Sequence, residues 1–259
     1  DWPKPTKDQQ LHWIGKKEGT EIEYPVEGLK ESIRCFSTRP DTNFGASFIV
    51  LAPEHPFVTK LLQKGFKLND EAKQNLAKIE AYVAKSKTKT ELDRIAEGKK
   101  KTGVFTGFYA VNRLNQTKLP IWISDFVLAG FGTGAVVGVP AHDLRDFQFA
   151  QQFALPIKRV VVGPGNEQGK VAQEKQVFED YGQVVNSDFL NGLDSLKAKS
   201  EVTQFLEKKG WGKYSVTYKL RDWLISRQRY WGAPIPIVYD PQGKAHPVKE
   251  EHLPWLLPS

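Results

Sequence analysis

Short apolar segments recur along most of the chain, and each is bounded by Gly, Pro or polar residues. They are rich in β-branched and aromatic side chains, and in the first of them Ile33 and Cys35 alternate with polar neighbours. Alternation and short length favour β-strands over helices. The sequence therefore predicts strands within residues 32–37, 44–52, 104–109, 119–123 and 157–162.

Helical periodicity is limited to a few places, and each is preceded by a side chain that can cap a helix. Asp194 precedes a helix for which Gly210 supplies the C-terminal stop. Thr90 precedes a second, shorter helix, and Asn69 precedes a third. The helix after Asn69 presents one apolar face, formed by Ala72, Leu76, Ile79 and Val83.

The order of these elements predicts the fold class and the domain organisation. Many short strands with scattered helices, and no strand–helix–strand rhythm, indicate an α+β domain with a barrel-like sheet as its core and helices at its periphery. Residues 1–20 are too few to bury themselves, and residues 218–259 open on a basic, aromatic run unlike the preceding body. We therefore expect a main domain at 21–217 with a flank on either side.

The composition indicates a soluble, folded protein with a weak preference for a polyanionic partner. The chain has 259 residues, of which 40% are hydrophobic, and a formal net charge of +7. No apolar run approaches the ~20 residues of a bilayer-spanning helix, and the N-terminus lacks the features of a signal peptide. Lysines are frequent in residues 85–101. The simpler interpretation is a solvated surface, and the more specific one is contact with RNA phosphates.

Cysteine and methionine usage bears on the compartment and on the origin of the chain. Cys35 is the single cysteine, which excludes an internal disulfide and predicts a buried thiol on a strand. This favours a cytosol-like compartment. The sequence has no methionine, from which we expect an excised or processed piece of a longer protein.

Candidate chemistry gathers in residues 132–149, GTGAVVGVPAHDLRDFQF. The spacing of Gly132, Gly134 and Gly138 differs from that of a dinucleotide-binding loop, and Pro140 stands where the helix of such a loop would already run. A strand that lets a backbone or a ligand approach closely is the better interpretation.

The polar residues in this stretch allow two interpretations. Asp143 and Asp146 have the spacing of an N-cap and an N3 residue, so spacing alone favours a structural capping box. Alternatively, Asp146 offers its carboxylate to a cationic group of a ligand at the rim of the glycine-rich strand. His142 is either a packed imidazole or a hydrogen-bond donor in a pocket.

A second polar cluster covers residues 37–42, where Thr38 and Thr42 flank an Arg-Pro-Asp sequence. One interpretation is a β-turn in which Pro40 fixes φ and Asp41 bonds the backbone. The other is a polar wall whose hydroxyl groups surround a hydrolytic water molecule.

No pattern in the sequence is typical of a metal site or of a covalent nucleophile. The five histidines, at positions 12, 55, 142, 246 and 252, are dispersed. Cys-x-x-Cys, His-Glu-x-x-His and Gly-x-Ser-x-Gly spacings do not occur. We expect no metal and no cofactor, and we expect water as the nucleophile if the chain is a hydrolase.

Four motifs along the chain form a combination that is typical of one family. They are Ser-Thr-Arg-Pro-Asp-Thr (37–42), Gly-Thr-Gly-Ala-Val (132–136), Val-Pro-Ala-His-Asp-Leu-Arg-Asp-Phe (139–147) and Arg-Asp-Trp-Leu-Ile-Ser-Arg-Gln-Arg-Tyr-Trp-Gly (221–232). This combination resembles leucyl-tRNA synthetases of the bacterial or organellar type; valyl enzymes typically show Thr-Arg-Pro-Glu-Thr at the first motif, and isoleucyl enzymes Thr-Thr-Pro-Trp-Thr. The resemblance covers essentially the whole chain. It identifies the chain as similar to the connective-polypeptide editing insertion, with the strands by which that insertion leaves and re-enters the catalytic domain.

The resemblance implies a six-stranded, mixed, barrel-like core and a hydrolytic site for mischarged tRNA-Leu. Water would attack the ester of an isoleucyl, norvalyl or methionyl group, assisted by a vicinal ribose hydroxyl, while leucyl-tRNA-Leu would be spared. By motif position, Asp146 would hold the α-ammonium group and Thr42 would block the leucine side chain. The other matching residues would line the site. Ser37, Thr38 and Arg39 would lie at the ester and the terminal ribose, and Val137, Val139 and His142 would complete the pocket. Arg145 would lie near the tRNA end.

Some positions depart from the family pattern. Ser37 stands where Thr is usual, Asn43 where an apolar residue is common, and Val137 where Met is frequent. Residues 240–244 stand where some relatives carry a cysteine pair, which again argues against zinc. The ATP-binding His-Ile-Gly-His and Lys-Met-Ser-Lys-Ser motifs of these ligases are absent, so this chain is not expected to activate leucine.

The leading hypothesis is a monomeric, metal-free editing esterase with tRNA-Leu as its partner and no membrane contact. We expect it in the cytoplasm, with the mitochondrial matrix as the alternative. The rival hypothesis is a non-catalytic RNA-binding domain, whose basic surface holds the acceptor end of tRNA without chemistry.

Overall fold

The computed structural model describes residues 2–90, 93–94, 101–130, 132–165, 171–218 and 236–253. The chain divides into two compact units, residues 1–219 and residues 220–259. The first unit contains both polar clusters of the sequence. None of the helices in the described ranges is long and apolar enough to cross a membrane. That the two flanks join a catalytic domain stays a prediction.

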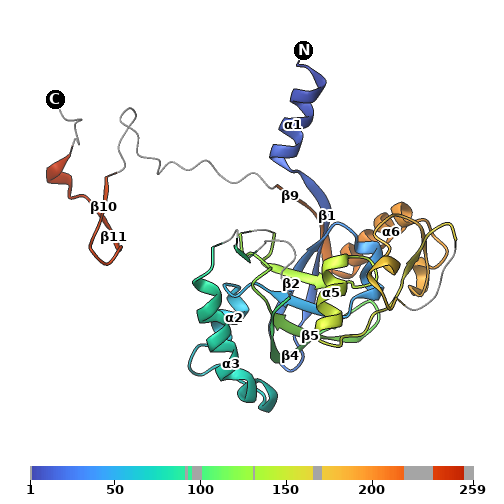
Figure 1. Cartoon of the computed structure of the whole chain (residues 1–259), viewed down its shortest axis with the longest axis horizontal. Coiled ribbons are helices and arrows are strands. Elements are labelled where there is room, and N and C mark those ends of the chain that lie inside the picture. The colour runs from blue at the N-terminus through green and yellow to red at the C-terminus, as the bar shows by residue number, and fades with distance from the viewer. Residues whose placement is uncertain are drawn as a thin grey trace. The chain divides into compact units, whose positions relative to one another are not determined.

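A four-stranded mixed sheet lies at the centre of the first unit (Figure 1). Its strand order is β4-β5-β3-β6, with β3 parallel to β5 and antiparallel to β6. All residues of β3 (Phe48–Leu51) are apolar and buried, as expected of a strand that is covered on both faces. The other strands are β4 (Val104–Asn112), β5 (Thr117–Ile123) and β6 (Ala135–Gly138).

A three-stranded antiparallel sheet, in the order β2-β1-β9, packs beside the first. In β2, Ile33 and Cys35 are fully buried and the residue before each is exposed, which confirms the predicted alternation. One isolated bridge, between Val26 and Ala110, connects this sheet to β4. The strands are β1 (Lys17–Pro25), β2 (Ser32–Ser37) and β9 (Gly212–Thr217).

The expected mixture of strands and helices is confirmed, but the six-stranded barrel-like core is not what the described strands form. They form separate sheets and do not close into a barrel. Where β2 and β6 lie side by side, their side chains pack, but no ladder of hydrogen bonds joins them in the described ranges. A barrel needs a continuous ladder around its circumference. The pattern of apolar residues predicts strands but does not predict which edges pair.

The predicted helices are confirmed where the structure describes them. Asn69 caps α3 (Asp70–Lys87) by accepting a hydrogen bond from Ala72 N–H at 2.7 Å. Asp194 caps α6 (Ser195–Lys209), and Gly210 ends it with φ of 66°. The helix predicted after Thr90 falls largely on residues outside the described ranges.

Helix α1 differs from the other long helices because it buries nothing. It covers Lys4–Ile14, contains no buried residue, and ends at Gly15 in the left-handed conformation. Trp13, in its last turn, is 69% exposed. This agrees with the prediction that the first segment of the chain is too short to bury itself.

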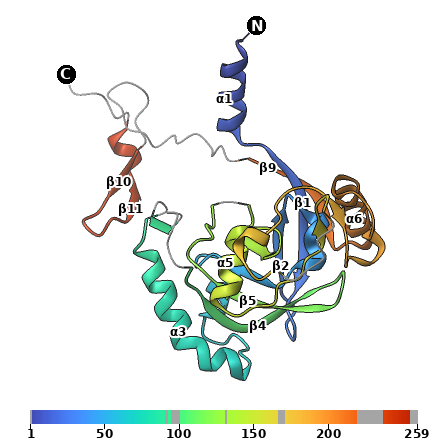
Figure 2. The same ribbon diagram turned by 45° about the vertical axis from the view of Figure 1, so that its right-hand side comes forward.

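Helix α5 (Leu144–Gln152) lies across the central sheet in both ribbon views (Figures 1 and 2). Its Phe149 is fully buried and stacks on Phe48 of β3, with 5.0 Å between the ring centroids. The Phe48 ring also occupies the space where a side chain at Gly138 would lie. The close approach predicted for the glycine-rich strand is therefore made by an aromatic ring of the core.

The remaining elements are short, and three of them belong to the second unit. In the second unit, the described residues 236–253 include no buried residue, and Asp240 Oδ2 lies 2.9 Å from His246 Nε2 across a hairpin.

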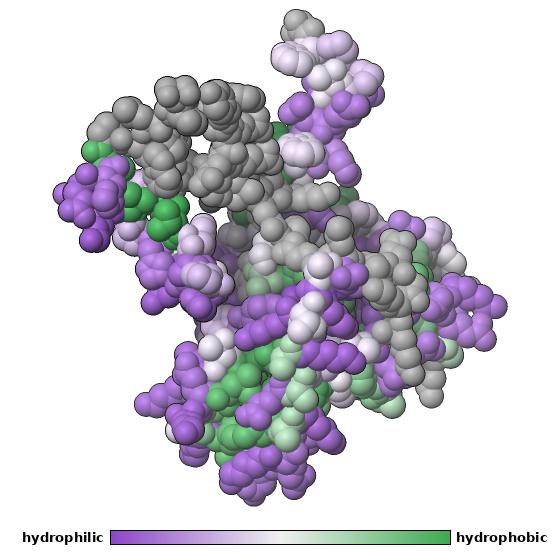
Figure 3. Space-filling model, turned by 60° about the vertical axis from the view of Figure 1, so that its left-hand side comes forward, coloured by the Kyte–Doolittle hydropathy of each residue, from purple (hydrophilic) through white to green (hydrophobic). Residues whose placement is uncertain are grey.

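Hydrophilic residues dominate the face drawn in Figure 3, with an apolar area exposed among them. The elements are α2 (Pro56–Leu61), η1 (Pro40–Gly45), β7 (Val161–Val162), η2 (Glu174–Gln176), β8 (Gln183–Val184), η3 (Asp188–Leu190), β10 (Ile237–Tyr239), β11 (Ala245–Pro247) and η4 (Glu250–His252).

Gly107 allows α3 to pack on β4, and its replacement should be costly. Its φ is +81°, and an added Cβ would collide with the backbone of Ala72. Gly107→Ala should lower the free energy of unfolding by about 3 kcal/mol or more. Gly28→Ala is the matched control, because φ is +75° there but nothing lies within 4 Å of the added Cβ; it should cost about 1–2 kcal/mol. Urea unfolding measures the free energy of unfolding of both variants. Equal losses of this free energy would contradict the packing argument.

Candidate active site

The two polar clusters predicted from the sequence come from neighbouring strands. Residues 37–42 follow β2, residues 139–146 follow β6, and these two strands pack against each other. Gly45, which ends the 3-10 helix that begins in the first cluster, lies close to Val139 of the second, since a Cβ added at Gly45 would lie 3.3 Å from Val139 Cγ1. Segments far apart in the sequence thus form two walls of one region.

The first wall is a buried 3-10 helix rather than the predicted β-turn. All residues of η1 (Pro40–Gly45) are buried, and Pro40 stands at its start, where a missing N–H leaves no hydrogen bond unmade. Thr42 Oγ1 donates a hydrogen bond to Arg39 O at 2.8 Å, and Ser37 Oγ accepts one from Arg39 N–H at 3.1 Å. Thr38 is half-buried. The hydroxyl groups of Ser37 and Thr42 therefore hold the start of this helix.

Arg39 and Asp41 form an ion pair within this wall. Asp41 Oδ2 lies 2.9 Å from Nη2 and 3.2 Å from Nε of Arg39. The Asp41 side chain is fully buried, and 18% of the Arg39 side chain is exposed. In one of the two interpretations of the sequence Asp41 bonds the backbone, but its buried charge is compensated by the guanidinium instead.

Asn43, a departure from the family pattern, is explained by its neighbours. It is 2% exposed. Its Oδ1 accepts a hydrogen bond from the Tyr24 hydroxyl at 2.6 Å, and Asn112 Nδ2 donates to its backbone carbonyl at 2.8 Å. Because a buried amide without partners is costly, Tyr24 and Asn112 make this polar side chain acceptable.

The second wall includes the N-terminus of α5, where the capping prediction is half confirmed. Asp143 Oδ1 accepts hydrogen bonds from the N–H groups of Arg145 and Asp146, at 2.8 and 3.1 Å. Asp146 does not return to the cap residue as a capping box requires. Its Oδ2 instead accepts a hydrogen bond from Val139 N–H at 2.8 Å.

Asp146 is the one carboxylate of the second wall that is buried, with 7% of the residue exposed. Burial, and secondly the carboxylate of Asp143, raise the pKa of Asp146 to about 8, although the Val139 N–H opposes this shift. A strongly raised pKa at the edge of a site is typical of functional carboxylates, although structural ones also show it. A cationic group beside Asp146 would favour its ionised form.

His142 is a packed imidazole whose two ring nitrogens both bind backbone groups. Its Nδ1 lies 2.8 Å from Phe178 O, and its Nε2 accepts hydrogen bonds from Val160 N–H and Val161 N–H at 3.0 and 3.1 Å. A carbonyl only accepts, so Nδ1 carries the proton and the ring is neutral. Burial lowers the pKa of His142 to about 4, which is consistent with this state.

The remaining predicted residues lie at different depths. Val137 and Val139 are each 7% exposed and belong to the main hydrophobic core. The Arg145 side chain is 75% exposed, and its Nη2 lies 3.8 Å from Asp143 Oδ2. The valines therefore support the wall, while Arg145 is accessible at its edge.

Sequence reasoning missed a segment, residues 178–181, that joins the two walls. Phe178 N–H donates to Ala141 O at 3.0 Å, and Glu179 Oε1 accepts from Leu144 N–H at 2.9 Å. On the other side, Arg39 Nη1 donates to the carbonyls of Glu179 and Asp180 at 2.8 and 3.3 Å. The segment has no periodicity or motif, so no sequence signal could have revealed it.

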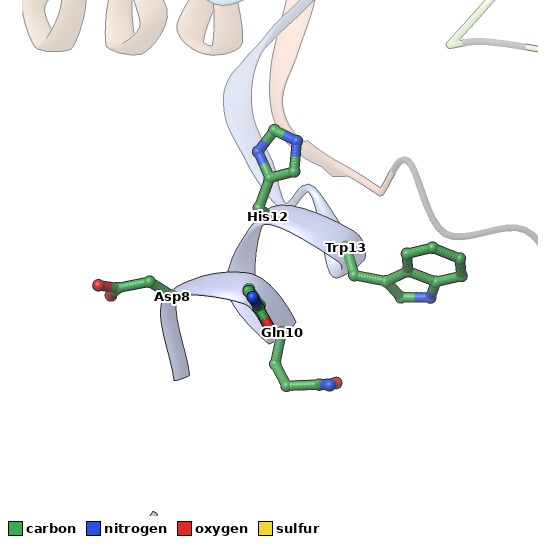
Figure 4. A pocket seen from close by; sticks show the side chains of 5 residues that line it. Asp8, Gln10, His12 and Trp13 are labelled. Atoms are coloured by element: carbon green, nitrogen blue, oxygen red, sulfur yellow. The ribbon is translucent and has the colours of Figure 1, made fainter. Parts of the chain in front are cut away.

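Two other features do not provide a competing site. Burial raises the pKa of the Cys35 thiol, which is fully buried in β2 and so is a poor nucleophile. Figure 4 shows an open hollow on α1, lined by Asp8, Gln9, Gln10, His12 and Trp13. All of its side chains come from one exposed helix and point in different directions, so they do not converge on a ligand. No group of three or more metal-ligating side chains occurs in the described ranges.

Comparison with known proteins identifies the family. Residues 11–207 match the family model described as leucyl-tRNA synthetase, editing domain. The chain belongs to this editing-domain family. Residues 185–255 also match the model described as tRNA synthetases class I (I, L, M and V).

The solved structures include a similar chain in a crystal structure of the ternary complex of Agrobacterium radiobacter K84 agnB2 LeuRS, tRNA and LeuAMS. The sequences are 35% identical and the TM-score is 0.68. The match covers 99% of the editing-domain chain described here but 27% of the chain in that complex. The resemblance inferred from the four motifs is thus confirmed, and so is the editing-domain fold, without a closed barrel.

The neutral imidazole of His142 should make the stability of the editing domain depend on pH. Its pKa is lowered in the folded state, so its contribution is present in full above pH 6.5 and is lost as the pH falls towards 4. His142→Leu should lower the free energy of unfolding at pH 7 by about 2–5 kcal/mol, because two buried N–H groups lose their acceptor. It should also flatten the decline between pH 6.5 and 4, measured by urea unfolding.

His12→Gln is the control for this experiment, because His12 lies on the exposed helix α1. It should leave both the stability at pH 7 and the decline with pH unchanged. A His142→Leu variant with the same decline as the unchanged chain would contradict the assigned hydrogen bonds.

Asp146 should show the opposite dependence on pH. Its carboxyl group stays protonated up to about pH 8 in the folded state but ionises near pH 3.8 when unfolded. Its contribution is therefore present at low pH and is lost as the pH rises through 8. Asp146→Asn cannot ionise, yet its amide oxygen can still accept from Val139 N–H, so the variant should gain stability relative to the unchanged chain between pH 5 and pH 8.5. A constant difference across these pH values, in urea unfolding, would argue against a buried acid.

Proposed function

We propose that the chain is a hydrolytic editing site that removes wrong amino acids from tRNA-Leu. Its substrates would be the isoleucyl, norvalyl and methionyl esters, and leucyl-tRNA-Leu would be spared. The observation that carries this proposal is the match of residues 11–207 to the leucyl-tRNA synthetase editing-domain model. The tRNA in the complex of the Agrobacterium radiobacter enzyme supports a tRNA partner.

A second site is needed because binding alone discriminates poorly between similar aliphatic side chains. One methylene group changes the binding free energy by only ~1–3 kcal/mol, so a synthetase also attaches near-cognate amino acids. A hydrolytic site that admits these amino acids and rejects leucine corrects the error after transfer to tRNA.

Asp146 would recognise the α-ammonium group of the aminoacyl ester. Its position supports this role, since one carboxylate oxygen is held by Val139 N–H and the group has no cationic partner among its hydrogen bonds in the described ranges. A bound ammonium would lower the pKa of Asp146 and form an ion pair in a largely buried environment.

Thr42 would exclude the leucine side chain. It is 2% exposed, and its hydrogen bond to Arg39 O holds its hydroxyl and methyl groups in one orientation. Val137 and Val139 support the same region as part of the core. A fixed side chain can reject a branched ligand because moving it would break a buried hydrogen bond.

Ser37 and Thr38 would line the ester and the terminal ribose, where water attacks the ester carbonyl. The carbon–oxygen bond to the ribose then breaks, the ribose oxygen takes a proton, and a free amino acid is released. A vicinal ribose hydroxyl would assist this proton transfer. Arg39 would lie beside the ester and the terminal ribose, held by Asp41, and His142 would complete the pocket, held by its bonds to the backbone. Arg145 would contact phosphate groups at the rim.

A deacylation assay of the full chain tests the proposal. Isoleucyl-tRNA-Leu and norvalyl-tRNA-Leu should be hydrolysed, and leucyl-tRNA-Leu should persist. Asp146→Asn should reduce hydrolysis at least tenfold, while Asp194→Asn, at the N-cap of α6, should not. Binding of tRNA without any hydrolysis would support the non-catalytic RNA-binding hypothesis instead.

Thr42→Ala should create a new activity, the hydrolysis of leucyl-tRNA-Leu. The expected gain is about 10- to 150-fold, as for other changes of one small group in an aliphatic pocket. Thr88→Ala is a matched control: Thr88 Oγ1 also donates to a carbonyl three residues before it at 2.8 Å, but at the exposed end of α3. Continued protection of leucyl-tRNA-Leu in Thr42→Ala would remove Thr42 from this role.

A further inference from the structure

Tyr181 presents an exposed aromatic ring next to the first wall. The residue is 50% exposed. The guanidinium carbon of Arg39 lies 4.5 Å from the centroid of its ring, so the cation stacks on one face. Because Arg39 lies between Ser37 and Thr42, this ring stands at the rim of the candidate site.

Hydrogen bonds hold the Arg39 guanidinium under the ring. Three of them, of 2.9 to 3.2 Å, join it to the buried carboxylate of Asp41. Two more reach the carbonyl groups of Glu179 and Asp180, the residues just before Tyr181. The same contacts thus fix the cation and the backbone that carries the ring.

The rest of the segment is also anchored. Glu179 accepts a hydrogen bond from the first N–H of α5, and Phe178 bonds Ala141 and His142. After the ring, Gly182 N–H donates to Ser195 Oγ at 3.1 Å. An aromatic ring that is already ordered loses little conformational entropy when a ligand stacks on it.

We propose that Tyr181, supported by Arg39, is a stacking platform for a base in the single-stranded 3′ end of tRNA. The base would lie upstream of the terminal nucleotide, whose ribose and ester are required at Ser37 and Thr38. Proteins that hold single-stranded RNA commonly stack its bases on aromatic rings, whatever the base. Lys199 Nζ, 5.9 Å from the same ring centroid, supplies a positive charge for the adjoining phosphate. This inference rests on the proposed function.

Comparison with Tyr214 supports a specific role for Tyr181. Tyr214 is 51% exposed on β9, so the two tyrosines are equally accessible. Tyr214 pairs with Thr20 of β1, which in turn pairs with Ser37, so it belongs to the same sheet as the first wall, and its backbone N–H binds Glu207 at 2.8 Å. Neither exposure nor the sheet distinguishes the two residues, whereas the guanidinium of Arg39 stacked on the ring of Tyr181 does.

Two substrates of different length test the platform. Tyr181→Ala should raise KM for isoleucyl-tRNA-Leu about 5- to 150-fold, the effect of one lost base stack, and leave kcat unchanged. Hydrolysis of isoleucyl-adenosine, which lacks the upstream nucleotides, should not change. Tyr181→Phe should retain the full activity because it keeps the ring, and Tyr214→Ala should behave as the unchanged chain.

The outcomes separate this inference from the proposed function. An unchanged KM in Tyr181→Ala would overturn the platform. Equal losses of activity with both substrates would also overturn it, because they would show that the ring only supports the pocket. Binding of uncharged tRNA-Leu, measured by fluorescence anisotropy, gives a readout without hydrolysis. Tyr181→Ala should weaken binding of the intact tRNA but not of a tRNA without its single-stranded 3′ end. This result would support the platform even if the chain hydrolysed no ester. If Tyr181→Ala bound the intact tRNA as tightly as the unchanged chain does, the platform would be refuted even if hydrolysis were normal.

Discussion

The neutral imidazole of His142 is bonded to two backbone segments that are far apart in the sequence. It bonds the N–H groups of Val160 and Val161 on one side and the carbonyl of Phe178 on the other. A protonated ring could not accept from two N–H groups, so the arrangement requires the neutral form that burial favours. Through Phe178 it places the segment that binds Arg39, and through its own backbone it places the start of α5. This side chain therefore adds to the bonds by which residues 178–181 join the two walls.

The two buried carboxylates of the site differ in how their charge is compensated. Asp41 is bound by the guanidinium of Arg39, so its ion pair is complete without any ligand. Asp146 receives a backbone N–H, and its pKa is raised to about 8. A complete ion pair and a buried carboxylate without a cationic hydrogen-bond partner in the described ranges thus lie in the same region. We interpret Asp41 as part of the scaffold and Asp146 as the group that responds to substrate.

Some of the site could be predicted from the sequence, and the rest could not for identifiable reasons. Local spacing predicts the cap at Asp143 because the bonds it makes reach only a few residues. The bond from Val139 to Asp146 is also short in sequence, but it requires the strand to turn back over the helix start. Glu179 and Tyr181 lie in an irregular segment, and their partners are at positions 144 and 39. No local pattern contains that information.

The sequence by itself determined the family and the capped helices α3 and α6, together with the alternation of β2. These features depend on motifs, local hydrogen bonds and the periodicity of apolar residues. The tertiary structure alone decided that the strands form separate sheets, that both ring nitrogens of His142 bind backbone groups, and that residues 178–181 join the walls. The physical reason is that strand edges and buried polar groups choose partners by proximity in space. That proximity is set by the packing of the whole core rather than by neighbours along the chain.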